Sequence, residues 1–454
     1  MTREARRPHA ASATLASAVG PLRARVRVPG SKSIANRALV AAVLAPPGST
    51  LRGVPDGDDV DAMCACLAAL GARIDDASRA VGGGGTEPTE RSGDATLRVT
   101  AGVDLDDPRA VILDARLAGT TSRFLTALAA LRVGTTTIDG AAPLRRRPAR
   151  DLHDALAVIG ATVRRTGDGD LPVEIARGGL DPRDASPWRI RVAGGASSQF
   201  ASALLLAGAA CAGGADVEIS GDAVSGDYVA LTAAVLADFG ARCVHEGSTW
   251  RVRGPLRSAT LGVEPDASSA TFAWCAAAVA GGRVDVPGLG RASAQSDARV
   301  VDVLARMGCT VHVDDGLGVS RDPAAPLVGI DVDLGATSDA VPAIAAVAAH
   351  ASGPTRIRGV AHVRAKESDR IADVVAMLHA VGVAAEPTDD GLVVRPDGAG
   401  PRPGTVATRD DHRLAMAAGV LATRAHGILV DDATVVSKSW PGHWAARDAW
   451  LATG

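Results

Sequence analysis

One phrase recurs six times along this chain: a glycine, then a short run rich in β-branched residues, then a turn. It reads GSTLRGV, GTTTIDG, GADVEISG, GGRVDVPG, GPTRIRG and GILVDD. The marking glycines are Gly48, Gly134, Gly214, Gly282, Gly353 and Gly427. They stand 68 to 86 residues apart. Repeats of this length are supersecondary units and not the turns of a solenoid.

A second phrase lies between the first, a helical run that ends in glycine and passes into a strand. It reads LAALGARID, LAVIGATVR, VLADFGARCV, VLARMGCTV and LHAVGVAAE. Glycine after a helix suits the left-handed cap position, and β-branched residues favour the strand that follows. The two phrases predict six α/β units of about 70–85 residues, each with two helices and about four strands. Helices such as SIANRALVAAVLA are apolar nearly all round, which is typical of helices buried inside a layer.

Composition excludes several classes of protein. At 454 residues the chain should form about two or three domains. A net charge of -3 argues against a nucleic-acid reader, and 2% aromatic residues leave few platforms for base stacking. No apolar run reaches the roughly 18–20 residues that a membrane span needs. We therefore expect a soluble globular protein that neither binds nucleic acid nor spans a membrane.

The N-terminus is rich in Arg, Ala and Ser, and we expect its first 20 or so residues to be a disordered tail. A transit peptide is the alternative, but Glu4 and the lack of a clear cleavage site argue against it. The glycine-rich stretch 81–94 is predicted to be a flexible loop.

The six cysteines lie in apolar runs or beside them, without a CxxC pair or zinc-like spacing to His. Buried, reduced thiols are the default for this pattern, and they fit a cytoplasmic protein. The sequence predicts no metal site.

Only three of the 48 basic residues are lysines: Lys32, Lys366 and Lys438. They stand in short polar runs, PGSKSIANR, RAKESDR and VVSKSW. A desolvated ammonium group can lose a proton, whereas a guanidinium cannot. Where a basic side chain must transfer a proton, arginine therefore cannot replace lysine. The alternative is that the three lysines are surface residues that remain by chance.

Seven motifs carry a resemblance to a known family. PGSKSIANR, LAGTTSR, RRRP, GGASSQF, KESDR, DDHR and SK occur in this order over about residues 20–450. Together they resemble the EPSP synthases, the 3-phosphoshikimate 1-carboxyvinyltransferases. The resemblance implies a two-domain inverse α/β barrel of six βαβαββ units, with the active site in the interdomain cleft. The first domain would hold 1–30 and 264–454, and the second 31–263.

The implied reaction transfers the enolpyruvyl group of phosphoenolpyruvate to the 5-hydroxyl of shikimate 3-phosphate and releases phosphate. It is a step of chorismate and aromatic amino acid biosynthesis. The resemblance implies no metal or organic cofactor, and a monomer whose partners are these two small molecules. Both substrates carry a phosphate and a carboxylate, so a site needs cations, hydroxyl donors and helix N-termini.

A strand with alternating apolar and polar residues is predicted just before an apolar helix, and the helix begins with Ser31, Lys32 and Ser33. Hydroxyls and backbone amides at a helix N-terminus form an anion-binding site. Arg37 lies one turn further on the same face. Ordinary capping beside a solvated lysine is the alternative. The resemblance implies that Lys32 contacts phosphoenolpyruvate, and that Ser33 and Arg37 lie on the side of the shikimate carboxylate.

Gly119, Thr120 and Arg123 open a second such helix, where glycine permits close approach of a ligand to the backbone. Arg147 ends an arginine run before proline, a pattern that in isolation indicates a solvated turn. The resemblance implies that Arg147 grips phosphoenolpyruvate. It also implies that Gly119 leaves room for glyphosate, so we expect sensitivity to this herbicide.

Ser197, Ser198 and Gln199 precede a third apolar helix, and two hydroxyls at a helix start suit a phosphate. The resemblance implies that this trio binds the phosphate of shikimate 3-phosphate. It places Ser225 and Tyr228, the only tyrosine of the chain, at the shikimate site. Packing is the more frequent role of a lone tyrosine.

Asp339 begins a helical run, where its carboxylate could cap the helix or act as a catalytic base. Lys366, Glu367 and Arg370 lie close together in one short segment. A solvated ion-pair cluster is the alternative for that segment. The resemblance implies that Asp339 contacts the attacking hydroxyl, Lys366 binds shikimate 3-phosphate, Glu367 transfers a proton and Arg370 binds phosphoenolpyruvate.

His412 and Arg413 open another apolar helix, and Lys438 follows near the C-terminus. The resemblance implies that Arg413 binds phosphoenolpyruvate, that His412 orients nearby groups and that Lys438 lies near the leaving phosphate. The implied mechanism is addition followed by elimination. Its catalytic residues are Lys32, Asp339, Glu367, His412 and Lys438.

Four positions depart from the family pattern. Leu117 and His362, the latter near shikimate 3-phosphate, stand where Asn is common. Phe124 replaces a frequent Pro, and Asp227 stands where Pro usually precedes the tyrosine. These changes affect fine geometry and remove no charged catalytic position.

Two other functions compete. Transfer to UDP-N-acetylglucosamine uses the same fold, typically with a reactive Cys in a mobile loop, and the corresponding loop 141–148 has none. A non-catalytic anion-binding scaffold would tolerate Arg or Asn at Lys32, Asp339, Glu367 and Lys438. Measuring phosphate release with shikimate 3-phosphate and with UDP-N-acetylglucosamine as acceptors distinguishes these three functions.

Overall fold

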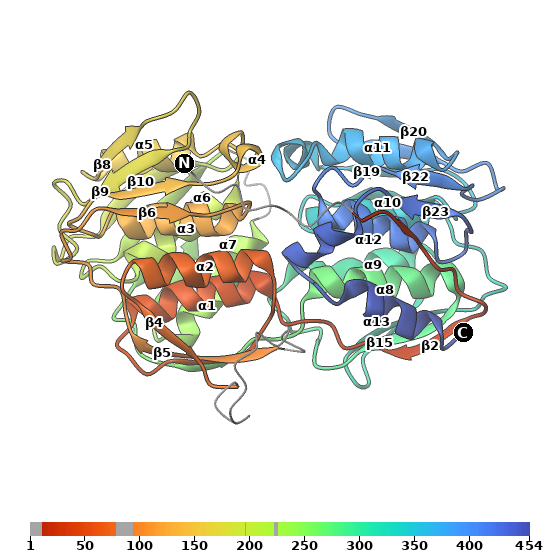
Figure 1. Cartoon of the computed structure of the whole chain (residues 1–454), viewed down its shortest axis with the longest axis horizontal. Helices are drawn as coiled ribbons and strands as arrows, with labels where there is room; N and C mark the ends of the chain where they lie inside the picture. Colours follow the sequence, from red (N-terminus) through yellow and green to blue (C-terminus); the bar gives the residue numbers. More distant parts are fainter. Residues whose placement is uncertain (1–10, 79–93, 196, 222–225) are drawn as a thin grey trace. The chain divides into compact units, whose positions relative to one another are not determined.

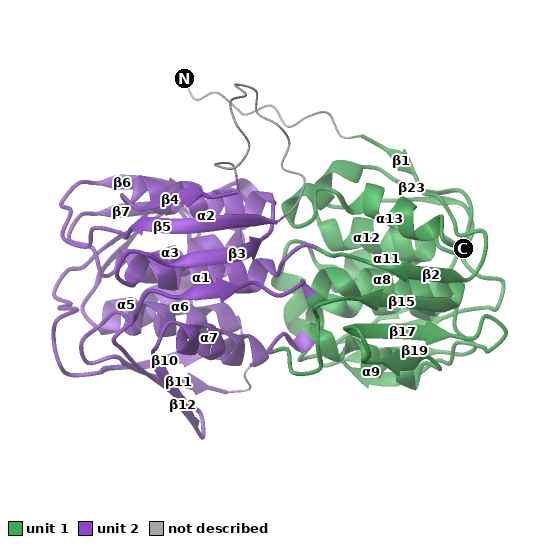
Figure 2. Ribbon diagram, turned by 90° about the horizontal axis from the view of Figure 1, so that it is seen from below, with its two compact units in different colours: residues 1–28, 267–293, 297–454 green, residues 29–266, 294–296 purple. Residues whose placement is uncertain are grey.

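The chain folds into two compact units (Figures 1 and 2) in a computed structural model that describes residues 11–78, 94–195, 197–221 and 226–454. Unit 1 comprises Met1–Val28, Ala267–Ser293 and Asp297–Gly454, and unit 2 comprises Pro29–Asp266 and Ala294–Ser296. The predicted domain boundaries, at 30/31 and 263/264, stay a prediction. Residues 81–93 of the predicted loop and Ser225 lie outside the described residues.

Three four-stranded sheets surround the helices of unit 2 within its described residues. The first has the order β14 (Thr260–Gly262), β3 (Thr50–Val54), β5 (Ala95–Ala101) and β4 (Arg73–Asp76). The second has β6 (Val111–Asp114), β7 (Thr136–Asp139), β9 (Val173–Ala176) and β8 (Thr162–Arg165). The third has β10 (Trp188–Ala193), β11 (Ala215–Ser220), β13 (Thr249–Arg253) and β12 (Arg242–Glu246).

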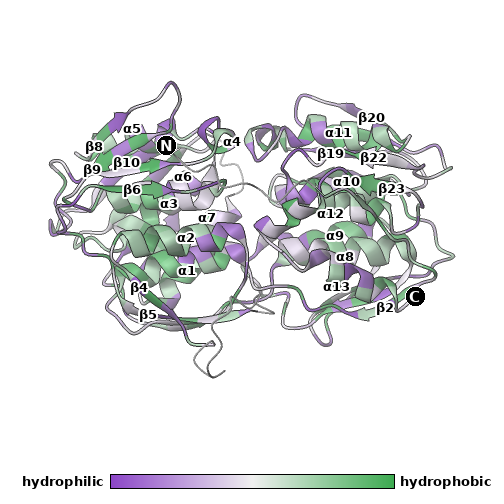
Figure 3. Ribbon diagram, viewed as in Figure 1, coloured by the Kyte–Doolittle hydropathy of each residue, from purple (hydrophilic) through white to green (hydrophobic). Residues whose placement is uncertain are grey.

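In unit 2, α1 (Lys32–Leu44), α3 (Gly119–Ala129) and α6 (Ser198–Gly208) lie among these sheets (Figure 2). The other α-helices in its described residues are α2 (Asp58–Ala69), α4 (Ala142–Arg145), α5 (Arg150–Val158) and α7 (Asp227–Asp238). Figure 3 colours much of α1, α3 and α6 hydrophobic, and most of their residues are buried. The apolar surface of these helices explains why they pack against one another and not on the outside.

Unit 1 has three sheets within the part of the chain that the structure describes. The first has the order β2 (Leu22–Arg25), β15 (Gly282–Val286), β17 (Leu317–Arg321) and β16 (Thr310–His312). The second has β18 (Asp331–Asp333), β19 (Thr355–Arg358), β21 (Leu392–Arg395) and β20 (Ala384–Pro387). The third has β22 (Gly404–Val406), β23 (Ile428–Val430) and β1 (Ala13–Thr14).

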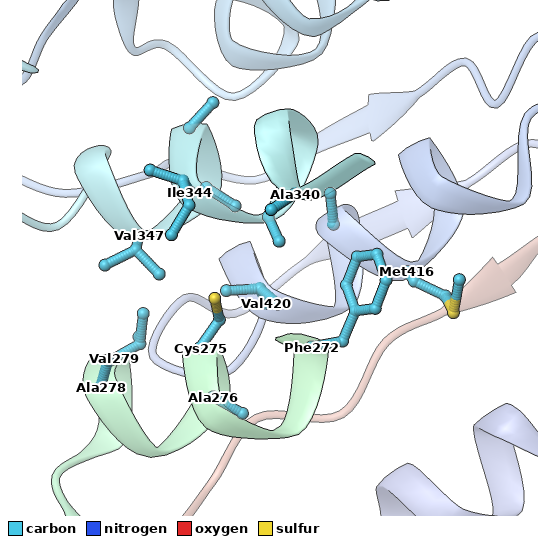
Figure 4. Packing of buried hydrophobic residues seen from close by; sticks show 14 of the residues in the cluster. Phe272, Cys275, Ala276, Ala278, Val279, Ala340, Ile344, Val347, Met416 and Val420 are labelled. Carbon is cyan, nitrogen blue, oxygen red and sulfur yellow. The ribbon is translucent and has the colours of Figure 1, made fainter. Parts of the chain in front are cut away.

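The inner helices of unit 1 are α8, α10 and α12. The α-helices are α8 (Ala267–Ala280), α9 (Val300–Arg306), α10 (Val341–Ala348), α11 (Arg370–Ala380), α12 (His412–Leu421) and α13 (His443–Leu451). The 3-10 helices in the described residues are η2 (Ser296–Arg299), which begins at the last residue of the unit 2 segment Ala294–Ser296, and η3 (Ser338–Ala340), η4 (Ala361–Ala365) and η5 (Ala433–Lys438) in unit 1. Figure 4 shows side chains of α8, α10 and α12, among them Phe272, Ile344 and Val420, pointing toward one another in the core.

The repeat of the sequence reappears as a repeated sheet. Each marking glycine comes just before or at the start of one strand: β3, β7, β11, β15, β19 or β23. In every sheet this strand has one parallel neighbour and one antiparallel neighbour, so the six sheets share one pairing pattern. The five predicted cap glycines all have positive φ, from 74° to 101°, which confirms the left-handed caps.

The chain passes from unit 1 to unit 2 after Val28 and returns after Asp266, and the short segment Ala294–Ser296 also belongs to unit 2. Strand β2 pairs with β15 in unit 1, but the helix that follows it, α1, belongs to unit 2. Strand β14 pairs with β3 in unit 2, but the helix that follows it, α8, belongs to unit 1. Each unit therefore completes one of its sheets with a strand taken from a crossing segment.

Two expectations need correction. Within the described residues, the third sheet of unit 1 has three strands and not four, and β1 takes an edge position on β23. Part of the expected disordered tail is ordered: in residues 11–20, β1 pairs with β23 and Leu15 is buried. The pairing supplies backbone hydrogen bonds, which a composition-based argument does not register. Residues 1–10 lie outside the described part.

No helix in the described ranges is both long and apolar enough to cross a membrane.

Candidate active site

The predicted residues of unit 1 come together at helix starts. Asp339 lies in η3, directly before α10, and Arg370 is the first residue of α11. Asp411 caps α12 by accepting a hydrogen bond from the Arg413 backbone N–H. Lys438 ends η5. The unit 1 cluster consists of Asp339, Lys366, Glu367, Arg370, Asp411, Arg413 and Lys438.

Asp339 is the carboxylate on which three cations converge. Lys366 Nζ lies 2.6 Å and Arg370 Nη1 2.7 Å from its Oδ1. Arg413 Nη2 lies 2.8 Å from its Oδ2. Lys366 also donates to Ser338 Oγ at 3.0 Å. Both carboxylate oxygens are therefore occupied by charge-assisted hydrogen bonds.

Arg370 joins three carboxylates from three segments. Besides Asp339, its Nη2 donates to Glu367 Oε2 at 2.8 Å and its Nε donates to Asp411 Oδ2 at 2.7 Å. Its side chain is 1% exposed and that of Asp411 is fully buried. The planar guanidinium suits this task because its donors diverge in fixed directions.

Glu367 also faces Lys438, whose Nζ lies 3.4 Å from Glu367 Oε1. His412 is buried beside Asp411, with 3.7 Å between His412 Nδ1 and Asp411 Oδ1. Glu367 therefore lies beside an ammonium group, and Asp411 lies beside an imidazole. These groups can accept, donate and relay protons.

The charges in the unit 1 cluster shift the protonation of its members. Burial alone raises the pKa of the Asp339 carboxyl, but Arg413, Lys366 and Arg370 outweigh burial and hold this pKa well below its usual range. Burial lowers the pKa of Lys366, a change that the neighbouring Asp339 partly opposes. Asp339 is therefore ionised at neutral pH, and Lys366 holds its proton less tightly than a solvated lysine.

His362 lies in η4, close enough to Lys366 and Asp339 to feel their charges. Burial, and then Lys366, lower the pKa of His362 to about 4. The imidazole is neutral at pH 7 and offers one donor and one acceptor. An Asn amide, the residue common at this position of the family, offers the same two functions.

In unit 2, Lys32 lies at the start of α1 behind its cap residue, Ser31. Its Nζ lies 2.9 Å from Asp59 Oδ2, and the two side chains are 16% and 6% exposed. Asp59 belongs to the first turn of α2, where a carboxylate is also favoured by the helix dipole. The ion pair fixes the ammonium group at the junction of two helix N-termini.

Arg37 lies one turn along α1 and is buried. Its Nε donates to Thr232 Oγ1 at 2.7 Å, and its Nη2 donates to Tyr228 O at 3.2 Å. Further contacts are from Nη1 to Ser33 O at 2.8 Å and from Nη2 to Ser202 Oγ at 3.5 Å. Burial lowers the pKa of Arg37 to about 10.

Gly119 starts α3 beneath two guanidinium groups. A Cβ atom at this position would lie 2.5 Å from Arg123 Nη1 and 2.7 Å from Arg147 Nη1. Arg123 Nη1 donates to Gln199 Oε1 at 3.1 Å, and Gln199 Nε2 donates to Thr120 Oγ1 at 3.3 Å. Two arginines, an amide and a helix N-terminus therefore share one small region, which suits an anion.

Ser197 and Ser198 start α6, where the Ser197 hydroxyl accepts from the Gln199 backbone N–H at 3.2 Å. Both serines line a small hollow with Gly226, which precedes α7. Tyr228 lies in the first turn of α7, and its carbonyl oxygen accepts from Arg37. The unit 2 cluster consists of Lys32, Ser33, Arg37, Asp59, Gly119, Arg123, Arg147, Ser197, Ser198, Gln199 and Tyr228.

Comparison with known proteins identifies the family. A sequence profile for EPSP synthase (3-phosphoshikimate 1-carboxyvinyltransferase) matches residues 16–446. The chain belongs to the EPSP synthase family. The 3-phosphoshikimate 1-carboxyvinyltransferase of Syntrophobacter fumaroxidans is 37% identical over 433 residues, which cover 94% of this chain and 96% of that protein. The enzyme of the same name from Shewanella sediminis is 34% identical with the same coverage.

Solved structures share the fold. EPSP synthase from Acinetobacter baumannii has a TM-score of 0.75 at 24% identity and covers 97% of this chain and 98% of its own. The enolpyruvyl transferase NikO from Streptomyces tendae has a TM-score of 0.73 at 19% identity, with coverage of 97% and 98%. The predicted family and the predicted two-domain inverse α/β barrel fold with repeated βαβ units are confirmed.

The predicted site residues fall into the two clusters, except Ser225, which lies outside the described residues, and His362 and His412, which lie beside the unit 1 cluster. Their roles stay predictions. The sequence analysis missed Asp59 and assigned no role in the site to Arg123 or Asp411. The signal was present, since each stands at the start of an apolar helix, but so do many solvated caps. Among the described residues, no group of three or more His, Cys, Asp or Glu could hold a metal ion.

Proposed function

We propose that this chain transfers the enolpyruvyl group of phosphoenolpyruvate to the 5-hydroxyl of shikimate 3-phosphate, which yields 5-enolpyruvylshikimate 3-phosphate and phosphate. Membership of the EPSP synthase family supports the reaction. The observation that carries the chemistry is the unit 1 cluster, where buried cations surround two carboxylates that can exchange protons.

Binding uses residues of both clusters. In unit 2, Ser197, Ser198 and Gln199 bind the phosphate of shikimate 3-phosphate, while Ser33, Arg37 and Tyr228 face its ring and carboxylate. Lys32 and Arg147 bind phosphoenolpyruvate there. In unit 1, Arg370, Arg413 and Lys438 bind phosphoenolpyruvate, and Asp339, His362 and Lys366 contact shikimate 3-phosphate. Each group is a donor or an acceptor of the kind that these anions and hydroxyls require.

The first step is addition. Carbon 3 of phosphoenolpyruvate takes a proton from Glu367 or Lys32, and the 5-hydroxyl oxygen bonds to carbon 2 as its own proton passes to Asp339 or Glu367. In the second step carbon 3 returns a proton to the residue that supplied it, the bond from carbon 2 to the phosphate oxygen breaks, and phosphate leaves beside Lys438. The fixed cations stabilise the anionic intermediate, which is usually the largest electrostatic contribution to catalysis.

Substrate binding changes the basicity of Asp339 in this scheme. Without substrates, Lys366, Arg370 and Arg413 hold the pKa of the Asp339 carboxyl low and make it a weak base. Phosphate and carboxylate groups of the substrates would attract the same cations. As these cations turn toward the substrates, the pKa of Asp339 rises, and the carboxylate becomes able to accept the hydroxyl proton.

The test measures release of inorganic phosphate from phosphoenolpyruvate with shikimate 3-phosphate or with UDP-N-acetylglucosamine as the acceptor. We expect release with shikimate 3-phosphate alone, and at least a hundredfold lower kcat for Asp339→Ala. Release with the nucleotide sugar alone would overturn the acceptor, and no release with either would favour the anion-binding alternative. Monomeric action in the cytoplasm stays a prediction, and sedimentation velocity checks the first part.

A further inference from the structure

Arg37 is a buried cation whose hydrogen-bond acceptors are all neutral groups in the described part of the chain. Its four hydrogen-bond acceptors are two hydroxyls and two backbone carbonyls, contributed by α1, α6 and α7. No carboxylate contacts its guanidinium in the described part of the chain. Because each acceptor is neutral, none of the described groups that contact the guanidinium cancels its positive charge.

Two aromatic rings supply the remaining support. Arg37 Cζ lies 5.3 Å from the ring centroid of Phe124 on α3 and 5.7 Å from that of Tyr228 on α7. A ring face attracts a cation through its quadrupole, and this attraction is strongest where water is excluded. Phe124 is 1% exposed and packed into the core of unit 2, so its ring has little freedom to leave.

This arrangement differs from that of Lys32, Lys366, Arg370 and Arg413, each of which contacts a carboxylate of the protein. A substrate anion that approaches those cations competes with Asp59 or Asp339. A carboxylate that reaches Arg37 meets no such competitor. In a water-excluded site an uncompensated cation attracts an anion strongly, so the position of this guanidinium controls affinity.

We propose that Phe124 is a positioning residue that sets the affinity for shikimate 3-phosphate. Its ring holds the Arg37 guanidinium charged and oriented toward the acceptor carboxylate. The inference rests on the proposed function, in which Arg37 faces this carboxylate. It also gives a physical role to one departure of this chain from its family, an aromatic residue where Pro is frequent.

The experiment compares Phe124→Leu with Phe239→Leu. Leucine keeps an apolar side chain but has no ring face. Phe239 is the matched control, because it is fully buried in the same unit and lies beneath no cation in the described residues. We expect Phe124→Leu to raise KM for shikimate 3-phosphate about tenfold, with kcat and KM for phosphoenolpyruvate changed less than about twofold. Phe239→Leu should change none of the three beyond about twofold.

Two further variants separate positioning from packing. Phe124→Tyr restores a ring face and should return KM for shikimate 3-phosphate to within about twofold of the wild type. In an Arg37→Ala background, Phe124→Leu should cause no additional rise in this KM, because the guanidinium through which it acts is gone. Phe124→Met, which fills the same space flexibly, replaces Leu if Phe124→Leu fails to fold.

The proposal is overturned if Phe124→Leu, or Phe124→Met in its place, raises both KM values equally, leaves both unchanged, or has its full effect in the Arg37→Ala background. Failure of the proposed function is distinguishable from these outcomes, because the wild-type protein would then release no phosphate. In that case calorimetric binding of shikimate 3-phosphate to wild type and Phe124→Leu replaces the KM comparison. Equal dissociation constants, or no binding by either protein, would count against the proposal.

Discussion

Gly119 shows at the residue scale how a missing side chain can be a functional requirement. The two guanidinium groups above it, those of Arg123 and Arg147, occupy the space that a Cβ atom would need. The obstructing atoms are the ends of flexible side chains, so an alanine here would displace arginines and leave the backbone in place. The effect should therefore appear in substrate binding and not in folding.

We predict that Gly119→Ala raises KM for phosphoenolpyruvate about tenfold to a hundredfold, since a displacement of about 1 Å in a positioning group can cost this much. KM for shikimate 3-phosphate should change less, and the melting temperature by no more than a few degrees. The control is Gly262→Ala in β14, where no atom lies within 4 Å of the new methyl group. Equal kinetic effects of the two substitutions would contradict the prediction.

At the scale of elements, Arg370 ties together the starts of α11 and α12 and the 3-10 helix η3. Its nitrogens reach Glu367, Asp411 and Asp339 in three directions. Asp411 in turn caps α12. One guanidinium thus fixes three segments that come from distant parts of the chain, and a single ammonium group could not span the same three carboxylates.

We predict that Arg370→Lys lowers the free energy of unfolding by about 3 kcal/mol, because it leaves a buried carboxylate without its partner. It should also lower kcat/KM at least a hundredfold. Arg358→Lys is the matched control in the same unit, because Arg358 is 45% exposed and pairs with Asp331 and Asp333 at the surface. A surface pair contributes about 0–1 kcal/mol. Urea unfolding measures the free energy of unfolding, and steady-state kinetics measures kcat/KM. A lysine variant with normal kinetics would refute the role of the guanidinium.

At the scale of the whole molecule, buried histidines couple stability to pH. His443 is enclosed by Trp440, Trp444, Trp450 and Phe272, at ring-centroid distances of 4.9 to 6.4 Å. Burial, and then Arg447, lower its pKa to about 3. Burial also lowers the pKa of His153 in unit 2 and of His350 in unit 1 to about 4. Each of these imidazoles is neutral in the folded protein.

The unfolded chain protonates histidine near pH 6.5, whereas the folded chain resists protonation down to about pH 4 or 3. Between these values the unfolded state binds more protons, so stability falls as pH falls. For His443 the loss from pH 7 to pH 4 is about 3 kcal/mol. We predict that His443→Phe loses less stability over this range than the wild type in urea unfolding.

The comparison between pH values matters here, since phenylalanine also changes packing at every pH. Trp444→Phe alters the same aromatic enclosure without removing a titrating group, so its stability should follow the wild-type pH dependence at a lower level. Parallel curves for wild type and His443→Phe would show that another group causes the acid loss.

The sequence predicted much of this architecture because glycine has a local conformational meaning. Gly71 or Gly382 needs only its own backbone to end a helix, so the pattern of caps and strands could be read without tertiary information. The motifs also placed Lys32 and Arg413 at helix starts. By contrast, Asp59 was indistinguishable from any other acidic residue in a first turn, because its contact with Lys32 depends on how α1 and α2 pack.

By itself the sequence determined the sixfold repeat, the family and the set of charged groups that can bind two anionic substrates, since these follow from local propensity and residue chemistry. Only the tertiary structure decided which charges meet. It placed Asp339 among three cations, surrounded Arg37 with neutral acceptors among the described residues and enclosed His443 in indole rings. It also brought β1 to the edge of β23. Such contacts join residues far apart in the chain, and both their energies and the pKa values depend on distance and burial, which spacing along a sequence does not contain.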